Sequence, residues 1–176
     1  MQKKELVIQQ AKILDSRKIQ KLVNKAYSSS DAGRSWTNES RVVSGERITV
    51  EQLQELFNAK NTSIIIAKLD RKIVGTVTLI NESYYVKLNM LAVDPEYQQY
   101  GIGKQLLQYS EQYLLEEFQS KKIRIDVVSS RTELIAFYER RGYVNCNTTY
   151  PYPTHLVSTR PYDLHLNVEV FEKILG

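Results

Sequence analysis

Hydrophobic and polar positions along the chain follow two different periods. Runs of apolar and β-branched residues predict strands. These runs lie at residues 5–11, 63–69, 72–80, 84–93, 122–128, 143–147 and 164–171. Apolar residues spaced by three and four positions predict amphipathic helices. The helices are expected after a cap at Asp15, after Thr49, over residues 102–118 and over residues 132–141.

Short polar signals mark where some of these elements begin and end. Thr49 and Gln52, three residues later, predict a capping box at the start of the second helix. Asp70 and Arg71 join two β-branched runs and predict a hairpin. Gly142 is expected to end the last helix, because left-handed geometry at a helix C-terminus favours glycine. The resulting order of strands and helices predicts an α/β fold, a mixed sheet covered by helices on both faces.

A turn containing two glycines, directly after the strand at residues 84–93, carries most of the chemical information. Gly101 and Gly103 open an amphipathic helix, and they allow backbone amides to approach an anion closely. A dinucleotide fingerprint would need a third glycine at Leu106, and a P-loop would need glycine at Gln98. Both standard nucleotide loops are therefore excluded. A tight strand-to-helix turn and a pyrophosphate site remain as the two interpretations of the glycines alone.

The spacing of Gln98, Gly101 and Gly103 resembles the Q/R-x-x-G-x-G/A acyl-coenzyme A signature of the GNAT superfamily of N-acetyltransferases. Residues 89–97 are similar to that family's fourth strand and the turn after it. Residues 131–143 resemble its second motif, commonly written as tyrosine, glutamate, lysine, any residue, glycine and aromatic. The resemblance implies one GNAT domain over residues 1–176, with a mostly antiparallel sheet of about seven strands.

The resemblance also implies acetyl-coenzyme A as the co-substrate and a primary amine, of a small molecule, as the acceptor in a ternary complex. The residues that it places at the cofactor are Leu91, Ala92, Val93, Gln98, Gln99, Tyr100, Gly101, Ile102, Gly103, Lys104, Arg131 and Tyr138. Arg131 departs from the family, many members of which carry asparagine there. Its guanidinium suits a phosphate or a substrate carboxylate, and a plain surface arginine is the alternative.

Acetyl transfer needs a site for the charge on the tetrahedral oxygen and help for the departing thiolate. In this family the strand at residues 84–93 is bulged and splayed, which implies the backbone amide of Leu91 as the oxyanion donor. Tyr138 matches the tyrosine proposed to donate a proton or a hydrogen bond to the leaving sulfur. Glu82 and Glu39 are candidate bases, because each is expected to border the cleft. A water chain without a dedicated base is the alternative.

Two long polar stretches, residues 27–47 and 148–162, are expected to select the substrate, because long loops on a rigid scaffold commonly carry specificity. Trp36, Glu39 and Arg47 are the candidate substrate residues. Trp36 either stacks on a ligand or anchors its loop by burying its ring. Arg47 suits a carboxylated amine, and a solvated arginine explains it equally well.

Composition and charge limit the ligands, partners and cellular location that are expected. The net charge of +4 and the pI near 9.0 favour an anionic ligand, but scattered basic residues and the lack of a recognisable module argue against nucleic acid. No apolar run is long enough to span a bilayer, so no membrane partner is expected. A single cysteine favours a cytoplasmic location. The histidines lack a third metal ligand, so no metal is expected. A homodimer, a non-catalytic acyl-coenzyme A-binding regulatory module and a protein or peptide acetyltransferase remain open.

Overall fold

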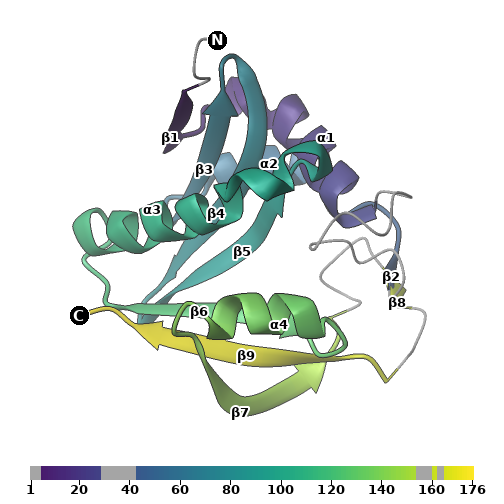
Figure 1. The fold of residues 1–176 in the computed structure, drawn as a ribbon, viewed down its shortest axis with the longest axis vertical. Coiled ribbons are helices and arrows are strands. Elements are labelled where there is room, and N and C mark those ends of the chain that lie inside the picture. Colours follow the sequence, from purple (N-terminus) through teal and green to yellow (C-terminus); the bar gives the residue numbers. More distant parts are fainter. Residues whose placement is uncertain (1–4, 29–42, 154–159, 162–164) are drawn as a thin grey trace.

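The computed structural model describes residues 5–28, 43–153, 160–161 and 165–176 (Figure 1). The helices are α1 (Ser16–Ser28), α2 (Val50–Asn58), α3 (Ile102–Glu116) and α4 (Thr132–Glu139), with short 3-10 turns η1 (Ile13–Asp15) and η2 (Pro95–Tyr100). The strands are β1 (Leu6–Gln10), β2 (Val43–Ser44), β3 (Thr62–Leu69), β4 (Lys72–Glu82), β5 (Tyr85–Val93), β6 (Lys122–Val128), β7 (Val144–Pro151), β8 (Arg160–Pro161) and β9 (Asn167–Ile174). No helix in the described ranges is long and apolar enough to cross a bilayer.

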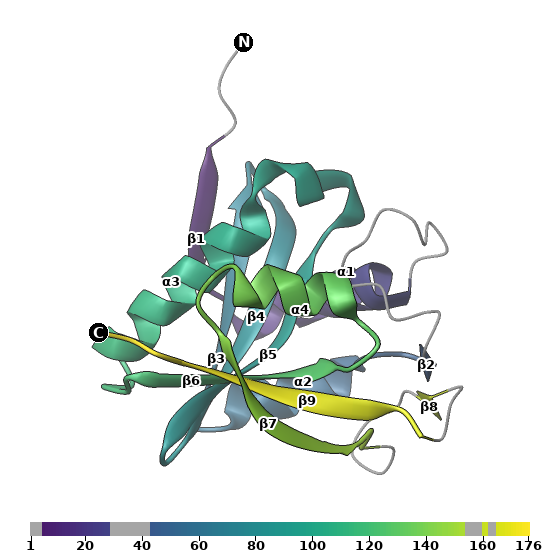
Figure 2. The same ribbon diagram turned by 60° about the horizontal axis from the view of Figure 1, so that its bottom comes forward.

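Seven strands form one mixed sheet in the order β1-β3-β4-β5-β6-β9-β7. The β5–β6 pair is parallel, and the other neighbours in this sheet are antiparallel. Helices α1 and α2 cover one face, whereas α3 and α4 cover the other (Figures 1 and 2). The predicted α/β fold, a mostly antiparallel seven-stranded sheet with helices on both faces, is therefore confirmed.

Strand β3 shows how the sequence builds a core on each side of the sheet. Successive side chains of a strand point to opposite faces. Ile65 and Ala67 belong to the apolar cluster under α3 and α4, while Ile64 and Ile66 belong to the cluster under α1 and α2. All four are almost completely buried. Such a continuous apolar run is what a strand covered on both faces requires.

Gly75 on β4 lies where α3 crosses the sheet. A Cβ atom at this position would lie 2.8 Å from Leu106 Cδ1 and 2.9 Å from Ile102 Cγ2. Both distances are shorter than real Cβ contacts, so only glycine allows α3 to pack this closely on β4. The contact sets the height of the first turn of α3 above the sheet.

Strand β5 is bulged and then separates from β6. In the β4–β5 pairing, Thr76 lies opposite Ala92 but Thr78 lies opposite Asn89, so β5 has an extra residue between them. Met90, within this bulge, has a positive φ of 50°. The parallel pairing with β6 extends only from Val86 to Leu88. The predicted bulge and splay of this strand are therefore present in the structure.

Several boundaries differ from the predicted ones. Asp15 lies inside the turn η1, where its Oδ2 accepts a hydrogen bond from Lys12 N at 3.0 Å, and α1 begins one residue later. Strand β7 continues past Asn147, because a bulge with φ of 54° at that residue interrupts the pattern without ending the strand. The pair β2–β8 was not predicted, since two-residue strands carry no periodicity.

Candidate active site

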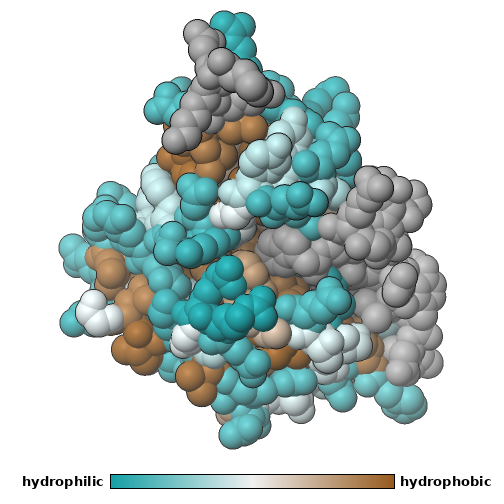
Figure 3. Space-filling model, viewed as in Figure 1, coloured by the Kyte–Doolittle hydropathy of each residue, from teal (hydrophilic) through white to brown (hydrophobic). Residues whose placement is uncertain are grey.

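The first feature of the site is a cleft between the N-terminus of α3 and the helix α4. It is lined by Gln98, Gly101, Gly103, Lys104, Glu133, Phe137, Arg140 and Arg141. Gly101 caps α3 in a left-handed conformation with φ of 68°, which leaves the first amides of the helix directed toward the cleft. Hydrophilic residues gather between these helices on the face in Figure 3. Helix amides together with Lys104, Arg140 and Arg141 form a suitable environment for a diphosphate.

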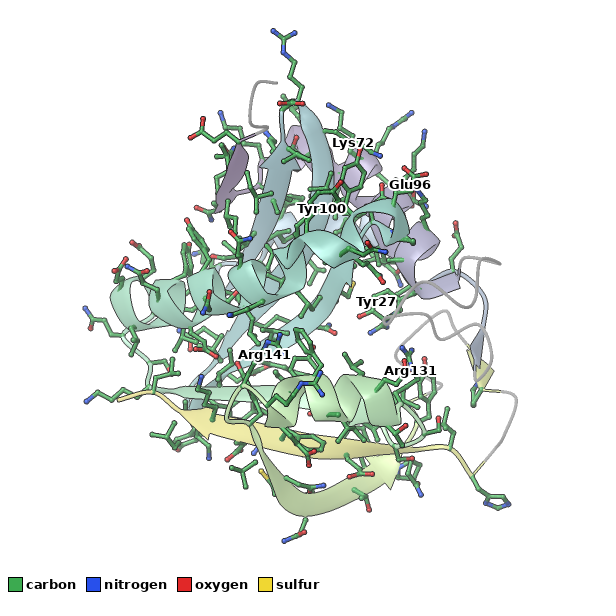
Figure 4. All side chains as sticks on the ribbon, viewed as in Figure 1. Tyr27, Lys72, Glu96, Tyr100, Arg131 and Arg141 are labelled. Carbon is green, nitrogen blue, oxygen red and sulfur yellow. The ribbon has the colours of Figure 1, made fainter. Side chains whose placement is uncertain are left out.

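Arg141 follows α4 and is held in place at this cleft by Phe137 of that helix (Figure 4). Its Nη1 donates to the Phe137 carbonyl oxygen at 2.7 Å, and its guanidinium carbon lies 3.6 Å from the centre of the Phe137 ring. Its Nε is buried and has no hydrogen-bond partner within the described residues. An oriented guanidinium with an unused buried donor fits a bound phosphate oxygen.

Asp94 anchors the turn that carries the glycines. Its carboxylate accepts from Lys25 Nζ at 2.8 Å, from Lys72 Nζ at 3.0 Å and from the Glu96 amide at 3.2 Å. Only 4% of the side chain is exposed. Burial opposes ionisation, but the hydrogen bonds from Lys25 and Lys72 outweigh it and lower the pKa of Asp94. The carboxylate therefore joins α1, β4 and η2 at the start of the glycine turn.

The second feature, called the splay cavity below, is a narrow cavity at the point where β5 and β6 separate. Its walls are Tyr27, Arg47, Leu88, Asn89, Met90, Leu91, Ile125, Asp126, Val127, Val128, Leu134 and Tyr138. The bulged segment of β5 thus faces this cavity beyond the last β5–β6 pair at Leu88 and Ile125. Backbone groups of β5 past Leu88 lack a ladder partner on β6. Two of them have other partners: the Met90 amide donates to Asn89 Oδ1, and the Leu91 carbonyl oxygen accepts from the Tyr27 hydroxyl.

Tyr138 closes the cavity from α4. Its ring packs edge-on against Phe137 and Tyr143, at centroid distances of 5.2 and 5.6 Å. Among the residues that the structure describes, its hydroxyl has no hydrogen-bond partner. Burial, with a smaller contribution from Tyr27, raises the pKa of Tyr138 well above its usual value, against the opposing effects of Arg141 and Arg131. The hydroxyl therefore remains protonated at neutral pH and is a hydrogen-bond donor.

Helix α1 supplies the opposite wall. The hydroxyl of Tyr27 donates to the Leu91 carbonyl oxygen at 3.2 Å. The guanidinium of Arg47 lies over the Tyr27 ring, 5.2 Å from its centre. The Arg47 amide donates to Asn24 Oδ1 at 2.8 Å, which fixes the segment before α2 against α1. Arg47, predicted from the sequence as a substrate residue, therefore lies at the splay cavity.

A third hollow opens from the splay point onto the sheet face formed by β5, β6, β9 and β7. Its lining residues are Arg47, Lys87, Leu88, Asn89, Asp126, Val128, Tyr150, Tyr152, Pro153 and Val168. Asp126 Oδ2 accepts from the Tyr150 hydroxyl at 2.7 Å and pairs with Lys87 Nζ at 2.5 Å. Burial, reinforced by the hydrogen bond to Asp126, raises the pKa of Tyr150. Arg47 and Asp126 line both this hollow and the splay cavity, so the two spaces are adjacent.

Half of the predicted cofactor residues line the cleft or the splay cavity. Gln98, Gly101, Gly103 and Lys104 line the α3–α4 cleft, and Leu91 and Tyr138 line the splay cavity. Ala92 and Val93 are buried on β5 beside them, whereas the side chain of Ile102 is in the core under α3. Gln99 and Tyr100 are exposed on η2, so their backbone is the part closest to the glycine turn. Arg131 is the N-cap of α4 and lies at the opposite end of that helix from Arg141 (Figure 4).

Glu82 does not join the site. It is exposed at the end of β4 and pairs with Tyr85, the first residue of β5. The antiparallel hairpin therefore places Glu82 at the opposite end of β5 from the bulge at Leu91. The structure gives no geometric support for Glu82 as the base. Trp36 and Glu39 lie outside the described residues.

Four residues of the site were not predicted from the sequence. Arg140 and Arg141 lie inside the second motif, and two adjacent cations before Gly142 were a signal for an anion site. Tyr27 was treated only as the start of a polar stretch, and Asp126 only as part of a strand. Neither has a local signal, because their positions in the site depend on contacts between distant segments.

Comparisons with known proteins agree with this geometry. A family model described as the acetyltransferase (GNAT) domain matches residues 24–152. The chain belongs to the GNAT acetyltransferase family, whose fold and coenzyme A cleft were expected from the glycine turn. No curated protein matches the chain.

Three solved structures illustrate the shared fold. A GNAT-family acetyltransferase from Streptococcus pneumoniae is 17% identical, with a TM-score of 0.72 over 98% of this chain and 100% of that one. The ribosomal-protein-S18-alanine N-acetyltransferase from Escherichia coli is 16% identical, with a TM-score of 0.71 over 98% and 95%. The spermidine N-acetyltransferase from Vibrio cholerae, in complex with CoA and spermine, is 18% identical, with a TM-score of 0.68 over 96% and 95%.

Proposed function

We propose that the protein is an N-acetyltransferase that moves the acetyl group of acetyl-coenzyme A to a primary amine of a small molecule, by direct attack in a ternary complex. The observation that carries this proposal is the splay cavity, which is lined both by Tyr138 and by Leu91 in the β5 bulge. Among the described residues, the Tyr138 hydroxyl has no hydrogen-bond partner. A thioester bound in this cavity would have the Tyr138 hydroxyl as donor to its leaving sulfur and the Leu91 amide as donor to its carbonyl oxygen.

The cofactor is proposed to lie along the surface from α3 to the splay. The amides that follow Gly101, together with Lys104 and Arg141, would hold the diphosphate. Amides of Leu91 and Val93 would bind the acyl and pantetheine carbonyls along the unpaired edge of β5. When bound, acetyl-coenzyme A supplies an activated thioester for attack by nitrogen.

Tyr138 is proposed to stabilise the departing thiolate by a hydrogen bond rather than by full proton transfer. A thiol resembling cysteine has a pKa near 8.5 and an ordinary tyrosine one near 10. Burial raises the pKa of Tyr138 further, so complete transfer from Tyr138 to sulfur is uphill. A buried neutral donor still stabilises a neighbouring anion, because charge-assisted hydrogen bonds are stronger than neutral ones.

A small amine as the acceptor is supported by the hollow over β5, β6, β9 and β7, which combines aromatic rings with charged groups of both signs. The spermidine N-acetyltransferase neighbour is named for a small polyamine, whereas the S18-alanine N-acetyltransferase neighbour is named for a protein. The proposal includes a single domain over residues 1–176, because one seven-stranded sheet contains both β1, the first strand of the chain, and β9, the last. It also includes a cytoplasmic location, for which the single cysteine is the argument.

Thiol release from acetyl-coenzyme A tests the proposal. The acceptor panel contains n-butylamine, putrescine, spermidine and glycinamide, with an S18-type alanine-ended peptide as the protein-substrate arm. Amine-dependent thiol release, with the N-acetylated product identified by mass spectrometry, is expected with at least one small amine. Stoichiometric binding of coenzyme A without turnover across the panel would instead identify a regulatory module. Turnover of the peptide alone would identify a protein acetyltransferase.

A further inference from the structure

We propose that Asp126 binds the amino group of the acyl acceptor through its carboxylate oxygen Oδ1. The proposal deepens the proposed function, on which it rests, by naming the group that recognises a primary ammonium. Asp126 lies on β6 and lines both the splay cavity, together with Tyr138, and the hollow that extends from it. It is therefore placed between the proposed thioester position and the space open to an acceptor.

The two oxygens of Asp126 have different surroundings. Oδ2 accepts from the Tyr150 hydroxyl at 2.7 Å and pairs with Lys87 Nζ at 2.5 Å. Oδ1 is fully buried and has no hydrogen-bond partner in the part of the chain that the structure describes. A buried carboxylate oxygen without a donor is costly, and such atoms in native proteins are usually satisfied by a ligand or water. The pair with Lys87 and Tyr150 keeps Oδ1 directed away from those two groups.

Alternation of side chains along β6 places Asp126 on the face of the sheet opposite the diphosphate cleft. Ile125 and Val127 belong to the cluster under α3 and α4, on the face that carries the diphosphate cleft. The intervening Asp126 points to the opposite face. Its partner Lys87 is similarly placed, because Val86 and Leu88 belong to the α3–α4 cluster. An acceptor on the Asp126 face would reach the splay from the side opposite the diphosphate, so cofactor and amine would not compete for space.

The chemistry of Oδ1 selects the kind of group that it binds. An ionised carboxylate oxygen only accepts hydrogen bonds, so its partner must be a donor. The thioester carbonyl and sulfur are acceptors, whereas a primary ammonium supplies three N–H donors and a positive charge. The ligand class that fits is therefore a compact primary ammonium. It must release one proton to water before its nitrogen attacks the thioester. The pantetheine arm of the cofactor also carries amide N–H donors, and the cofactor-binding arm of the experiment distinguishes them from the amine.

Asp126→Asn separates the role of Oδ1 from the pairing of Oδ2. Lys87 and the Tyr150 hydroxyl both donate, so they are expected to hold the amide oxygen and leave the amide NH₂ at the Oδ1 position. A donor then faces the incoming ammonium. The matched control is Glu172→Gln on β9, a carboxylate that pairs with Arg124 and Lys122 outside both cavities. The two side chains are similarly buried, with 14% exposure for Asp126 and 18% for Glu172.

Calorimetry is performed on the full chain saturated with coenzyme A, with n-butylamine, putrescine, spermidine and glycinamide titrated as probes. We expect Asp126→Asn to weaken the tightest-binding probe by about 10- to 100-fold, the range of a charge-assisted hydrogen bond. Coenzyme A affinity should stay within about twofold of wild type, since no backbone donor of the cofactor site is altered. Glu172→Gln should leave both affinities unchanged. In steady-state assays the KM for the amine should rise more than kcat falls.

Equal amine affinity in wild type and Asp126→Asn would overturn the proposal, as would an equal loss in Glu172→Gln or failure of every probe to bind wild type. Loss of coenzyme A affinity in Asp126→Asn would assign Oδ1 to pantetheine instead. Amine binding that depends on Asp126 without acetyl transfer would refute the proposed function while leaving this inference intact. If Asp126→Asn does not fold, a crystal structure with coenzyme A and n-butylammonium decides, since the nitrogen must lie within hydrogen-bond distance of Oδ1.

Discussion

The hydroxyl of Tyr27 donates a hydrogen bond to the carbonyl oxygen of Leu91, at 3.2 Å, and so connects α1 to the bulge of β5. The two residues are 64 positions apart in the chain. The bond fixes the peptide plane that joins Leu91 to Ala92. This plane meets, at the Leu91 Cα atom, the preceding peptide, whose amide is the proposed oxyanion donor. The wall that carries Arg47 is thereby coupled to the proposed oxyanion donor.

Tyr27→Phe is expected to lower kcat about tenfold and the free energy of unfolding by about 1 kcal/mol, the usual contribution of one hydrogen bond. The ring under Arg47 is retained, so amine KM should change less than kcat. Denaturant unfolding and steady-state kinetics measure the two quantities. Tyr113→Phe, which removes the hydroxyl contact with Ser63 at 3.0 Å, is the control. It should cost similar stability with normal kcat, and an equal loss of kcat in both variants would refute the coupling.

Tyr138→Phe is expected to reduce turnover about 100-fold, within the range of general acid catalysis. Coenzyme A affinity should remain close to wild type, because the hydroxyl is proposed to act on the sulfur only after attack has begun. Thiol release under saturating amine gives kcat, and calorimetry gives the affinity. The ring still packs against Phe137 and Tyr143, so the fold should be preserved. Turnover near the wild-type rate would remove Tyr138 from the mechanism.

Gly75→Ala is expected to destabilise the fold by about 1–3 kcal/mol, the typical cost of overpacking. The added methyl group would clash with Ile102 and Leu106, so α3 must shift on β4. Because α3 begins at the glycine turn, coenzyme A affinity should also fall. Thermal unfolding and calorimetry measure both effects. Leu106→Ala combined with Gly75→Ala should cost less than the sum of the single changes, and strict additivity would contradict the proposed contact.

The sequence predicted those parts of the fold and site that depend on short segments. Period-two and helical patterns located the main strands and helices, and the spacing of Gln98, Gly101 and Gly103 located the α3–α4 cleft. The bulge at Leu91 was expected from a family resemblance and not from propensity. It could not be derived locally, because the extra residue is visible only in the pairing with β4.

Residues whose role depends on distant segments escaped prediction. Asp126 is flanked by apolar residues in an alternating strand, a pattern typical of a solvent-facing carboxylate. Its burial depends on Lys87 from β5 and Tyr150 from β7, which the sheet order brings together. Glu82 was expected to border the cleft. The antiparallel β4–β5 hairpin places it at the opposite end of β5 from the bulge, which is visible only in the strand pairing.

Asp94→Asn is expected to destabilise the fold by about 1–3 kcal/mol at neutral pH. The loss is no larger because Lys25 and Lys72 are half exposed, so solvent screens their attraction to Asp94. The folded state lowers the pKa of Asp94, so its contribution is fully present above its unfolded pKa of about 4. That contribution is lost as the pH falls through the lower folded value. Denaturant unfolding from pH 7 to pH 2 should therefore show the difference between wild type and variant shrinking below about pH 4. A difference that is constant over this range would mean that Asp94 acts only by packing.

Arg141→Gln is expected to weaken coenzyme A binding about tenfold, the loss for one charge-assisted hydrogen bond to a phosphate oxygen. The guanidinium is fixed by Phe137 and presents a buried Nε without a partner among the described residues, so its removal costs the site an oriented donor. Calorimetry with coenzyme A and with pantetheine separates binding of the diphosphate from binding of the pantetheine arm, because only coenzyme A carries the diphosphate. Pantetheine affinity should therefore be unchanged. Arg71→Gln, at the β3–β4 hairpin and outside the cleft, controls for the loss of one positive charge. Equal weakening in both variants would reduce the role of Arg141 to long-range attraction, which salt would then screen.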